Sequence, residues 1–511
     1  PERALRRRLD LVADDDVRAP ALRALTELEA ARDAVAAAAG DAADLVDALE
    51  SLEATFTGLT GAAPTRRDGQ LGAGRTLVYE DCRRDVEVTI GTAALAGLGP
   101  PLALLLDSAR WFTFAGAALF QRACADIYRD RCRQRGTAEL PFAEFWLWIN
   151  DLFADESGPL ITPVTRAFQE RWAKVLAVPP GQRRVRYAAS ALRAQVAAVF
   201  AAPRPGWGGA VRHSPDVMIA ASSLEDIEAG RFEWVLGELH PGTDTLSSGV
   251  FFTQHPDQDD LRRAVVADVP PRVLLASSRG DQGPPIRIRK LVSGPDDLRL
   301  VFGRDTCLRD PRQALPVGHC VLEEVGGRLV VRTRDGRHTF TLIDVLGELL
   351  MQHLLQQFRI LPAAGHTPRI TVDRMVLSRE CWTFDPAGLT FAGDRDEAQR
   401  FLAVRQWRLA HGMPRFVFAH TSAERKPFFV DFDSLASADL LARSVRRAAR
   451  SDARSGAPSG APSGVSPRVT VAEMLPEPGQ LWLTDIDGNR YTSELRLVAV
   501  DRRHAHPAES G

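Results

Sequence analysis

Apolar side chains recur at helical spacing through the first sixty residues. Leu and Val stand three or four positions apart in the Ala-rich stretches Ala21–Ala39 and Ala42–Phe56, a pattern typical of amphipathic helices. Asp41 directly precedes the second stretch, and aspartate is a favoured helix N-cap. The pattern therefore predicts two or three helices across residues 1–60.

Helical spacing returns after residue 100. A helix is predicted from Pro101 to Arg135, because Pro is favoured at helix starts and glycine, here Gly136, just past helix ends. Further helices are predicted over Phe142–Phe153 and Pro163–Leu176. A helical stretch is also predicted over Gln182–Phe200, and it carries Arg183, Arg184, Arg186 and Arg193. A solvated helix face is the favoured interpretation of these arginines, and a phosphate-contacting surface is the alternative.

From about residue 211 the pattern changes to the alternation typical of strands. Strands are predicted over Val211–Ala221, Phe232–Leu239, Arg272–Ser277, Ile286–Ile288, Leu298–Phe302, Cys320–Glu324, Leu329–Arg334, His338–Thr341, Arg369–Leu377, Leu389–Ala392, Phe416–Ala419 and Phe428–Phe432. Helical segments are predicted over Leu224–Gly230, Ile343–Phe358, Asp396–His411 and Ala436–Ala449. Asp335-Gly336 and Asp487-Gly488 are strong hairpin-turn signals. An earlier strand pair is predicted over Leu77–Tyr79 and Val86–Ile90.

The order of these elements predicts a multi-domain α+β fold, with a helical N-terminal region followed by mixed β-sheet domains with packed helices. The predicted segments are a helical segment at 1–60, a strand pair plus helical region at 61–210, a mixed α/β region at 211–450, a flexible linker at 451–467, a hairpin segment at 468–501 and a tail at 502–511. The linker repeats SGAP and holds no core-forming residue. The chain begins at Pro1 without Met, so we expect the first segment to continue from a missing N-terminal part.

Composition narrows the function classes. Of the 511 residues, 45% are hydrophobic and 25% are charged, values of an ordinary globular protein. A net charge of −2 argues against coating nucleic acid over the whole surface, but allows a local basic groove. Six cysteines without CxxC spacing predict reduced thiols and a cytoplasmic protein. The most apolar run, Pro101–Phe120, contains Asp107 and Arg110, which favours a buried helix over a membrane span.

The common catalytic motifs are absent. The sequence has no GxGxxG after a strand, no GxxxxGK[ST], no HExxH and no GxSxG. Dense polar clusters at strand ends remain as candidates. The first is Gly74–Val88, GRTLVYEDCRRDVEV, where charges beside apolar strands indicate either a paired structural network or a binding site.

A second cluster contains Glu238 and His240, which share one face of a predicted strand. A carboxylate in this position can orient an imidazole, so the pair is a candidate general base or substrate-holding pair. A hydrogen-bonded core pair that anchors the following Pro-Gly turn is the equally weighted alternative.

A third cluster follows residue 414 and contains Arg415, Lys426, Asp431 and Asp433. A lysine that approaches phosphate and two carboxylates that hold a hard cation suit nucleotide activation. An edge strand with ordinary surface charges is the alternative. The sequence has two more polar clusters. One contains Arg369, Asp373, Arg374, Arg379 and Glu380, and the other contains Glu473, Asp485, Arg490, Tyr491, Glu494 and Arg496. In the last of these we predict that Glu494 and Arg496 pair with each other.

Four stretches in order are similar to the N-terminal, tRNA-dependent domain of the lantibiotic dehydratase family. They are GRTLVYEDCRRD, SPDVMIAASSLEDIEAGRFEWVLGELHPGTDTL, PRFVFAHTSAERKPFFVDF and EMLPEPGQLWLTDIDGNRYTSELR, and the resemblance spans roughly residues 60–500. In full-length members this domain transfers glutamate from glutamyl-tRNA to Ser or Thr of a precursor peptide, and a C-terminal domain eliminates it. The chain ends at Gly511, so we expect that elimination domain to be absent.

Short members of this kind resemble peptide aminoacyl-tRNA ligases. The resemblance then implies an ATP- and Mg²⁺-dependent ligase in natural-product biosynthesis that adds an amino acid from aminoacyl-tRNA to the C-terminus of a ribosomally made carrier peptide. The alternatives are glutamyl transfer to Ser or Thr of a precursor peptide by a split dehydratase, and a non-catalytic scaffold that binds the leader peptide. A homodimer and the absence of a membrane partner complete these expectations.

The resemblance also implies where the chemistry lies. It places Arg75, Thr76 and Asp81 near the aminoacyl-tRNA or acyl-transfer site, and Glu238, His240, Arg415 and Lys426 near that site or the nucleotide. Asp431 and Asp433 are the predicted nucleotide-binding carboxylates, and no metal ligand is assigned. Asp244 stands where the family pattern has Asn, which leaves its role open. Arginine-rich segments at 183–193, 369–379 and 443–450 are expected to form a local groove for tRNA.

Overall fold

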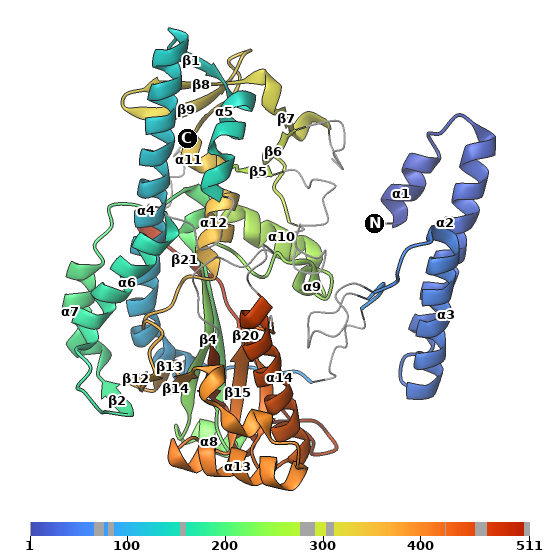
Figure 1. Cartoon of the computed structure of the whole chain (residues 1–511). Coiled ribbons are helices and arrows are strands. Elements are labelled where there is room, and N and C mark those ends of the chain that lie inside the picture. The colour runs from blue at the N-terminus through green and yellow to red at the C-terminus, as the bar shows by residue number, and fades with distance from the viewer. Residues whose placement is uncertain are drawn as a thin grey trace. The chain divides into compact units, whose positions relative to one another are not determined.

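The computed structural model describes residues 2–65, 76–79, 86–153, 160–275, 292–302, 311–424, 426–454 and 468–504 (Figure 1). The chain divides into two compact units. One contains Pro1–Arg83 with His420–Phe428, and the other contains Arg84–Ala419 with Phe429–Gly511. The predicted multi-domain α+β class is confirmed, because long helices are combined with several mixed sheets.

The smaller unit contains the predicted N-terminal helices. They are α1 (Glu2–Leu9), α2 (Asp15–Ala37) and α3 (Ala42–Thr60). Asp41 accepts hydrogen bonds from the backbone N–H groups of Ala43 and Asp44, so its predicted role as the N-cap of α3 is confirmed.

The predicted strand pair at Leu77–Tyr79 and Val86–Ile90 is wrong for the described residues, since 76–79 and 86–90 have no strand pairing. An isolated two-stranded hairpin is marginally stable and needs a third strand or a packed helix. The prediction rested on two short apolar runs, which do not by themselves indicate such a partner.

A single long helix, α4 (Thr92–Arg135), organises the larger unit. Figure 1 shows it running from the strands near β13 to those near β1. It ends at Gly136 in the left-handed conformation, as predicted, but begins nine residues before the predicted start at Pro101. Pro100 and Pro101 therefore lie inside the helix. Burial of neighbouring Leu98 and Leu102 offsets the helix-breaking preference of proline.

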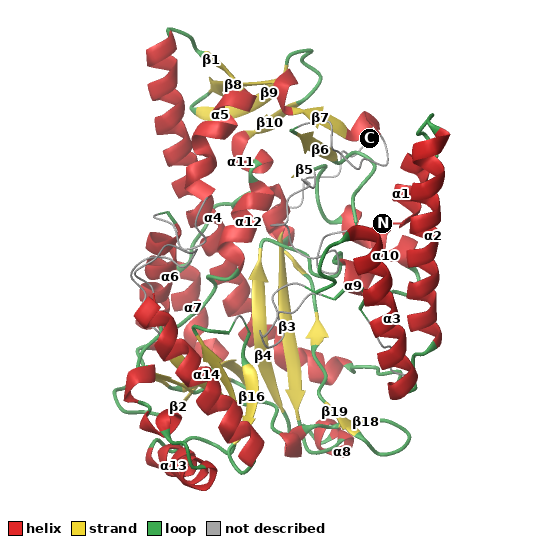
Figure 2. Ribbon diagram, turned by 45° about the vertical axis from the view of Figure 1, so that its right-hand side comes forward, coloured by secondary structure: helices red, strands yellow, loops and turns green. Residues whose placement is uncertain are grey.

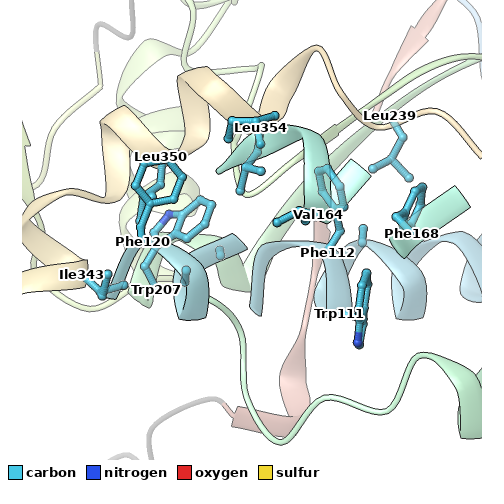
Figure 3. Close-up of a cluster of buried hydrophobic side chains, with 14 of the residues drawn as sticks. Trp111, Phe112, Phe120, Val164, Phe168, Trp207, Leu239, Ile343, Leu350 and Leu354 are labelled. Atoms are coloured by element: carbon cyan, nitrogen blue, oxygen red, sulfur yellow. The ribbon is translucent and has the colours of Figure 1, made fainter. Parts of the chain in front are cut away.

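Further helices pack against α4 to build the main core. They are α5 (Phe142–Ile149), α6 (Ile161–Leu176), α7 (Ala189–Val199), α11 (Leu342–Val345) and α12 (Gly347–Leu355). The predicted helix at Ile343–Phe358 is thus interrupted at Leu346. Figure 3 shows the aromatic centre of this core, where Phe112 contacts Phe168 with ring centroids 4.9 Å apart.

Helix α4 is the one helix in the described part of the chain that is long and apolar enough to cross a membrane. Its middle is buried in the core, where Leu105, Ala109 and Phe112 are fully enclosed. Core packing therefore accounts for its apolar composition, as the sequence predicted.

A seven-stranded sheet carries the candidate site. Its order is β2 (Arg184–Tyr187), β12 (Arg369–Val372), β13 (Met375–Ser378), β4 (Glu233–Pro241), β3 (Arg212–Ala220) and β20 (Leu495–Arg496), with β21 (Ala499–Val500) also paired to β3. Strands β3 and β4 are long antiparallel neighbours (Figure 2). The indole N–H of Trp234 on β4 donates to the carbonyl of Ala94 at 3.2 Å and joins this sheet to α4.

Two predictions for this sheet are wrong. Residues 184–187 form β2, not the start of a helix, because they pair in parallel with β12. The predicted single strand Arg369–Leu377 is instead the hairpin β12–β13, which turns at Asp373 with a φ of 51°. In both cases pairing between distant segments overrides the local pattern.

The remaining strands form smaller sheets. A five-stranded sheet has the order β11 (His366–Thr367), β14 (Cys381–Phe384), β17 (Val469–Glu473), β15 (Phe416–Thr421) and β16 (Phe428–Asp431). A four-stranded sheet contains β1 (Glu139–Pro141), β8 (Cys320–Val325), β9 (Arg328–Thr333) and β10 (Thr339–Thr341). The others contain β5 (Val273–Leu275), β6 (Leu298–Val301) and β7 (Ala314–Pro316), and the hairpin β18 (Leu483–Thr484) and β19 (Arg490–Tyr491).

Both predicted Asp-Gly turns are confirmed, since Gly336 and Gly488 have positive φ between paired strands. The helices α8 (Leu224–Glu228), α9 (Gly249–Phe252), α10 (Gln258–Ala267), α13 (Glu397–Ala410) and α14 (Leu435–Arg454) complete the described elements. The predicted strand at Leu389–Ala392 is wrong, because Thr390–Gly393 is a 3-10 turn packed against α14. The four described cysteines are free thiols, as predicted.

A matched pair of leucines tests the role of the α4 core. Leu105→Ala should lower the free energy of unfolding by about 2–5 kcal/mol, because Leu105 is fully buried and its truncation leaves a cavity. Leu147→Ala on α5 should cost about 0.5 kcal/mol or less, because Leu147 is 72% exposed. Denaturant unfolding of the whole chain measures both, and equal shifts would contradict this description of the core.

Candidate functional site

The candidate site is built on the pairing of β3 with β4. In this register Asp216 lies opposite Glu238, and Ser214 lies opposite His240. The register shifts between Asp216 and Val217, a bulge that redirects the side chains near it. On the other edge of β3, Arg496 of β20 lies opposite Asp216. One position of β3 is therefore flanked by ionisable side chains on both sides.

Asp216 and His240 form a hydrogen-bonded dyad. His240 Nε2 lies 2.9 Å from Asp216 Oδ2, and both side chains are almost fully buried. Glu238 Oε2 is 3.6 Å from the same imidazole nitrogen, but the Glu238 side chain is 70% exposed. The predicted pairing of Glu238 with His240 is thus present at longer range, while the closer partner, Asp216, was missed. Its signal in the sequence is a charged residue directly before the apolar half, 217–220, of a predicted strand.

The guanidinium of Arg496 completes the cluster. Arg496 Nη1 lies 2.5 Å from Asp216 Oδ2, and Arg496 Nη2 lies 2.5 Å from Glu494 Oε1. The predicted pair of Glu494 and Arg496 is confirmed. Burial raises the pKa of Glu494, and the positive charge of Arg496 opposes that rise. The guanidinium also stacks over the ring of Phe251, 5.4 Å from its centroid.

Arg379 is a half-buried cation that two backbone carbonyls hold in place. It donates to the backbone carbonyls of Leu236 at 3.0 Å and Leu475 at 2.9 Å. Burial lowers the pKa of Arg379, and the charges of Glu473, Glu494 and Glu238 act against that effect. The positive charge of Arg379 therefore compensates part of the negative charge of these carboxylates.

The dyad is arranged for proton transfer. When Nε2 of His240 carries its proton and donates to Asp216, Nδ1 is left as the basic nitrogen. Nδ1 receives no hydrogen bond from any described residue. One ligand atom each from Asp216, Glu238 and His240 also lie within 4.8 Å of one another, close enough to share a metal ion. Arg496 already places a positive charge on the same Asp216 oxygen, so we interpret the cluster as an acid–base group.

A neighbouring network of buried carboxylates ties β12 to the five-stranded sheet. Arg369 of β12 forms a two-pronged ion pair with Glu473 of β17, with Nε 2.7 Å from Oε1. Glu473 also accepts the backbone N–H of Glu380 at 2.8 Å. Burial acts to lower the pKa of Arg369, but the hydrogen bonds and charge of Glu473 outweigh it and raise that pKa overall.

Among the other predicted site residues, Arg415, Asp431 and Asp433 pair with one another. Arg415 donates through Nε and Nη2 to both Asp431 oxygens at 2.8 Å, and Asp433 lies 3.2 Å from the same guanidinium. Both carboxylates are thus already paired with a cation. Lys426 is exposed and belongs to the smaller unit. The assignment of these residues to ATP and Mg²⁺ stays a prediction.

Of the three candidates near residue 76, only Thr76 is described. It is exposed, and its hydroxyl donates to the carbonyl of Val78 at 2.6 Å. Arg75 and Asp81 lie outside the described residues. Asp244, where the family pattern has Asn, forms a buried pair with Arg212 at 3.2 Å and accepts the N–H of Leu246.

Several of the arginines expected to line a tRNA groove are engaged within the protein. Arg183 pairs with Glu380, Arg186 with Glu233 and Arg443 with Asp439. Arg184 and Arg193 are exposed and form no hydrogen bond or ion pair with the described residues. Fewer of these arginines are therefore available to contact tRNA phosphates than the sequence alone indicates.

Comparison with known proteins supports the resemblance found in the sequence. Residues 350–441 match the family described as lantibiotic dehydratase, N terminus. The resemblance to lantibiotic dehydratases is confirmed. No curated protein sequence matches the chain significantly.

A solved structure with a TM-score above 0.5 shares the fold of this chain. The glutamylation domain TbtB from thiomuracin biosynthesis has a TM-score of 0.53 at 17% identity, covering 96% of this chain and 62% of that one. The same domain bound to 5'-phosphodesmethylglutamycin gives a TM-score of 0.46 at 17% identity, with 79% and 50% coverage. The tRNA-dependent lantibiotic dehydratase MibB from Microbispora sp. 107891 gives 0.39 at 16% identity, with 61% and 32% coverage. The chain thus spans less than two thirds of the first protein's length.

A buried histidine beside the dyad predicts acid sensitivity. His213 of β3 is fully buried, and its Nδ1 accepts the backbone N–H of Gly242 at 3.1 Å. Burial lowers the pKa of His213 from 6.5 to about 4; Asp501 opposes this shift, while Arg110 and Arg503 reinforce it. The unfolded chain therefore takes up this proton first as the pH falls from 6.5 towards 4, and stability declines by about 3 kcal/mol over that window.

His213→Asn should remove this part of the pH dependence, because an Asn carboxamide oxygen accepts the Gly242 N–H and takes up no proton. Unfolding midpoints at pH 7 and pH 4.5 measure the effect. The exposed His319 gives the matched control His319→Asn, which should keep the wild-type difference between the two pH values. An unchanged difference in His213→Asn would contradict the prediction.

The Arg369–Glu473 pair is open to a double-mutant test. Arg369→Met should destabilise the protein by about 3–5 kcal/mol, because it leaves the buried Glu473 charge without its partner. Adding Glu473→Gln removes that charge and should recover part of the loss. Thermal unfolding compares the variants, and a double variant less stable than Arg369→Met would count against the pairing energy.

Proposed function

We propose that the chain is a tRNA-dependent transferase that moves a glutamyl group from glutamyl-tRNA to a Ser or Thr hydroxyl of a precursor peptide. The observation that carries this proposal is the likeness of 96% of the chain to a glutamylation domain. The match of residues 350–441 to the lantibiotic dehydratase N terminus supports it independently. Glutamyl transfer was the sequence-based alternative to ATP-dependent ligation, and these comparisons favour it.

The reaction is an acyl transfer between two oxygens. The peptide hydroxyl attacks the glutamyl ester carbonyl, a new C–O bond forms, and the bond to the tRNA ribose oxygen breaks. The hydroxyl must lose a proton and the ribose oxygen must gain one. A single group that accepts the first proton and returns the second serves both steps.

His240 is the residue that we assign to this proton transfer. Its Nε2–H donates to Asp216, which fixes the ring and stabilises the imidazolium that forms when Nδ1 accepts the hydroxyl proton. Arg496 fixes the position of the Asp216 carboxylate, because its guanidinium lies 2.5 Å from the same oxygen. Glu238 is mostly exposed beside the ring and is positioned to contact substrate.

Partners and cofactors follow from the same proposal. The transferase uses glutamyl-tRNA and a precursor peptide and needs no nucleotide for the acyl transfer, because the aminoacyl ester is already activated. ATP and Mg²⁺ belong to the competing ligase hypothesis, in which the carrier peptide carboxylate is activated first. Asp431 and Asp433, the carboxylates predicted for the nucleotide site of that hypothesis, are both paired with Arg415.

The decisive assay incubates the full-length protein with glutamyl-tRNA and a Ser/Thr-containing precursor peptide, with and without ATP, and weighs the peptide by mass spectrometry. We expect glutamyl additions on Ser or Thr under both conditions. Addition of one residue to the C-terminus only with ATP would replace this proposal by the ligase. Peptide binding without any addition would replace it by the scaffold.

His240→Asn should lower the rate of glutamyl transfer by about 10²-fold or more, the usual contribution of a general base. The pH dependence of the residual rate should also flatten, because the proposed proton acceptor is gone. His319→Asn serves as the exposed control and should keep the wild-type rate and pH profile. A His240→Asn variant with the wild-type rate would exclude the assigned role.

A further inference from the structure

A polar cavity lies at the start of β2, and no residue of the dyad lines it. It has a volume of about 290 Å³ and is lined by Arg183, Arg184, Glu380, Gly412 and Pro414. Ligand pockets usually range from roughly 300 to 1,000 Å³. The volume therefore suits a small polar molecule of the size of one amino acid.

Glu380 gives the cavity an unusual negative group. Its side chain is 1% exposed, yet it lines the cavity. Oε1 accepts from Arg183 Nε at 2.6 Å and lies 2.9 Å from His366 Nε2. Oε2 accepts no hydrogen bond from any described residue. Because Oε2 is accessible at the cavity surface, an N–H group of a ligand can reach it and form a charge-assisted hydrogen bond.

Two arginines supply positive charge beside that carboxylate. Arg183 uses Nε for Glu380 and Nη2 for the carbonyl of Gly412 at 2.7 Å, which leaves Nη1 without a partner among the described residues. Arg184 is exposed and makes no side-chain hydrogen bond or ion pair within the described chain. The cavity therefore offers one acceptor for a cation and two donors for an anion.

The backbone around the cavity is held in place for this arrangement. The N–H of Glu380 donates to Glu473 Oε1 at 2.8 Å, which anchors the corner between β13 and β14. Gly412 has a φ of 61°, and a Cβ there would lie 2.5 Å from Arg183 Nη1. The positive φ of the turn therefore favours a glycine here, and a Cβ would require the flexible Arg183 side chain to move.

We propose that this cavity binds a free α-amino acid as its zwitterion. The α-ammonium group donates to Glu380 Oε2, and the α-carboxylate accepts from Arg184 and from Arg183 Nη1. A simple anion would leave the Glu380 oxygen unpaired, and a simple amine would leave both guanidinium groups unused. The site is separate from the His240 dyad, and its occupancy does not depend on the proposed glutamyl transfer.

The test measures binding of each common L-amino acid to the full chain by saturation-transfer NMR, with affinities from calorimetry. For the tightest ligand, the analogues without the amino group, without the carboxylate, and with a methyl ester are compared. Each should bind about tenfold more weakly or worse, since each loses one charge-assisted contact. Equal binding of the analogue without the amine would show an anion site only, and equal binding of the ester would point to an aminoacyl ester. Either result, or no binding by any amino acid, overturns the proposal.

Arg184→Ala is the principal variant, because the Arg184 side chain is exposed and makes no hydrogen bond or ion pair within the described chain. It should weaken amino-acid binding about tenfold or more without changing the unfolding midpoint. Arg193→Ala removes another exposed, unpaired arginine outside the cavity and should bind like wild type. Glu380→Gln should abolish the preference for the amine-bearing ligand. Wild-type affinity in Arg184→Ala would overturn the assignment whatever the stability of Glu380→Gln.

Discussion

The pairing of β3 with β4 is the constraint on which the candidate site depends. This register brings Asp216 opposite Glu238, and the bulge after Asp216 lets its carboxylate reach His240 two residues further along the partner strand. A slip of one residue would turn these side chains to the other face of the sheet. Burial of Val217, Ile219 and Trp234 holds the register, because a slipped pairing would expose them. The polar cluster is therefore positioned by apolar packing along the same two strands.

Buried charge in the larger unit is balanced locally. Arg369 with Glu473, Arg212 with Asp244, and Arg110 with Asp501 are each nearly enclosed ion pairs between segments far apart in the chain. Such pairs are weak evidence for added stability, since desolvation offsets much of the attraction. These pairs instead favour one relative position of the segments that they join. A packing that separated the two members would leave a buried charge without its partner and is therefore disfavoured. The Arg379 guanidinium, held by two carbonyls, extends the same balance to the carboxylates around the dyad.

The two polar sites differ in what their charges leave open. Around His240, Asp216 Oδ2 pairs with the imidazole and with Arg496, while Asp216 Oδ1 and the imidazole Nδ1, a proton acceptor, accept no hydrogen bond from the described residues. Around Glu380, one small cavity is lined by a carboxylate with an open acceptor oxygen, by Arg183 with an open Nη1 and by Arg184. The first arrangement suits proton transfer and the second suits recognition of a doubly charged ligand. Arg379 and Glu380 are neighbours in sequence, so the turn that follows β13 contributes to both.

The sequence by itself determined the features that depend on near neighbours. Helix α3 with its Asp41 cap, the end of α4 at Gly136, the Asp-Gly hairpins, and the shared face of Glu238 and His240 all follow from residues within a few positions of one another. Tertiary structure alone decided the partners across strands. Asp216 lies 24 residues from His240, and Arg183 lies 197 residues from Glu380, so no local pattern joins them. The local pattern predicts a helix through the arginines at 183–186. Residues 184–187 instead form a strand paired with β12, because hydrogen bonds to a distant segment outweigh local preference.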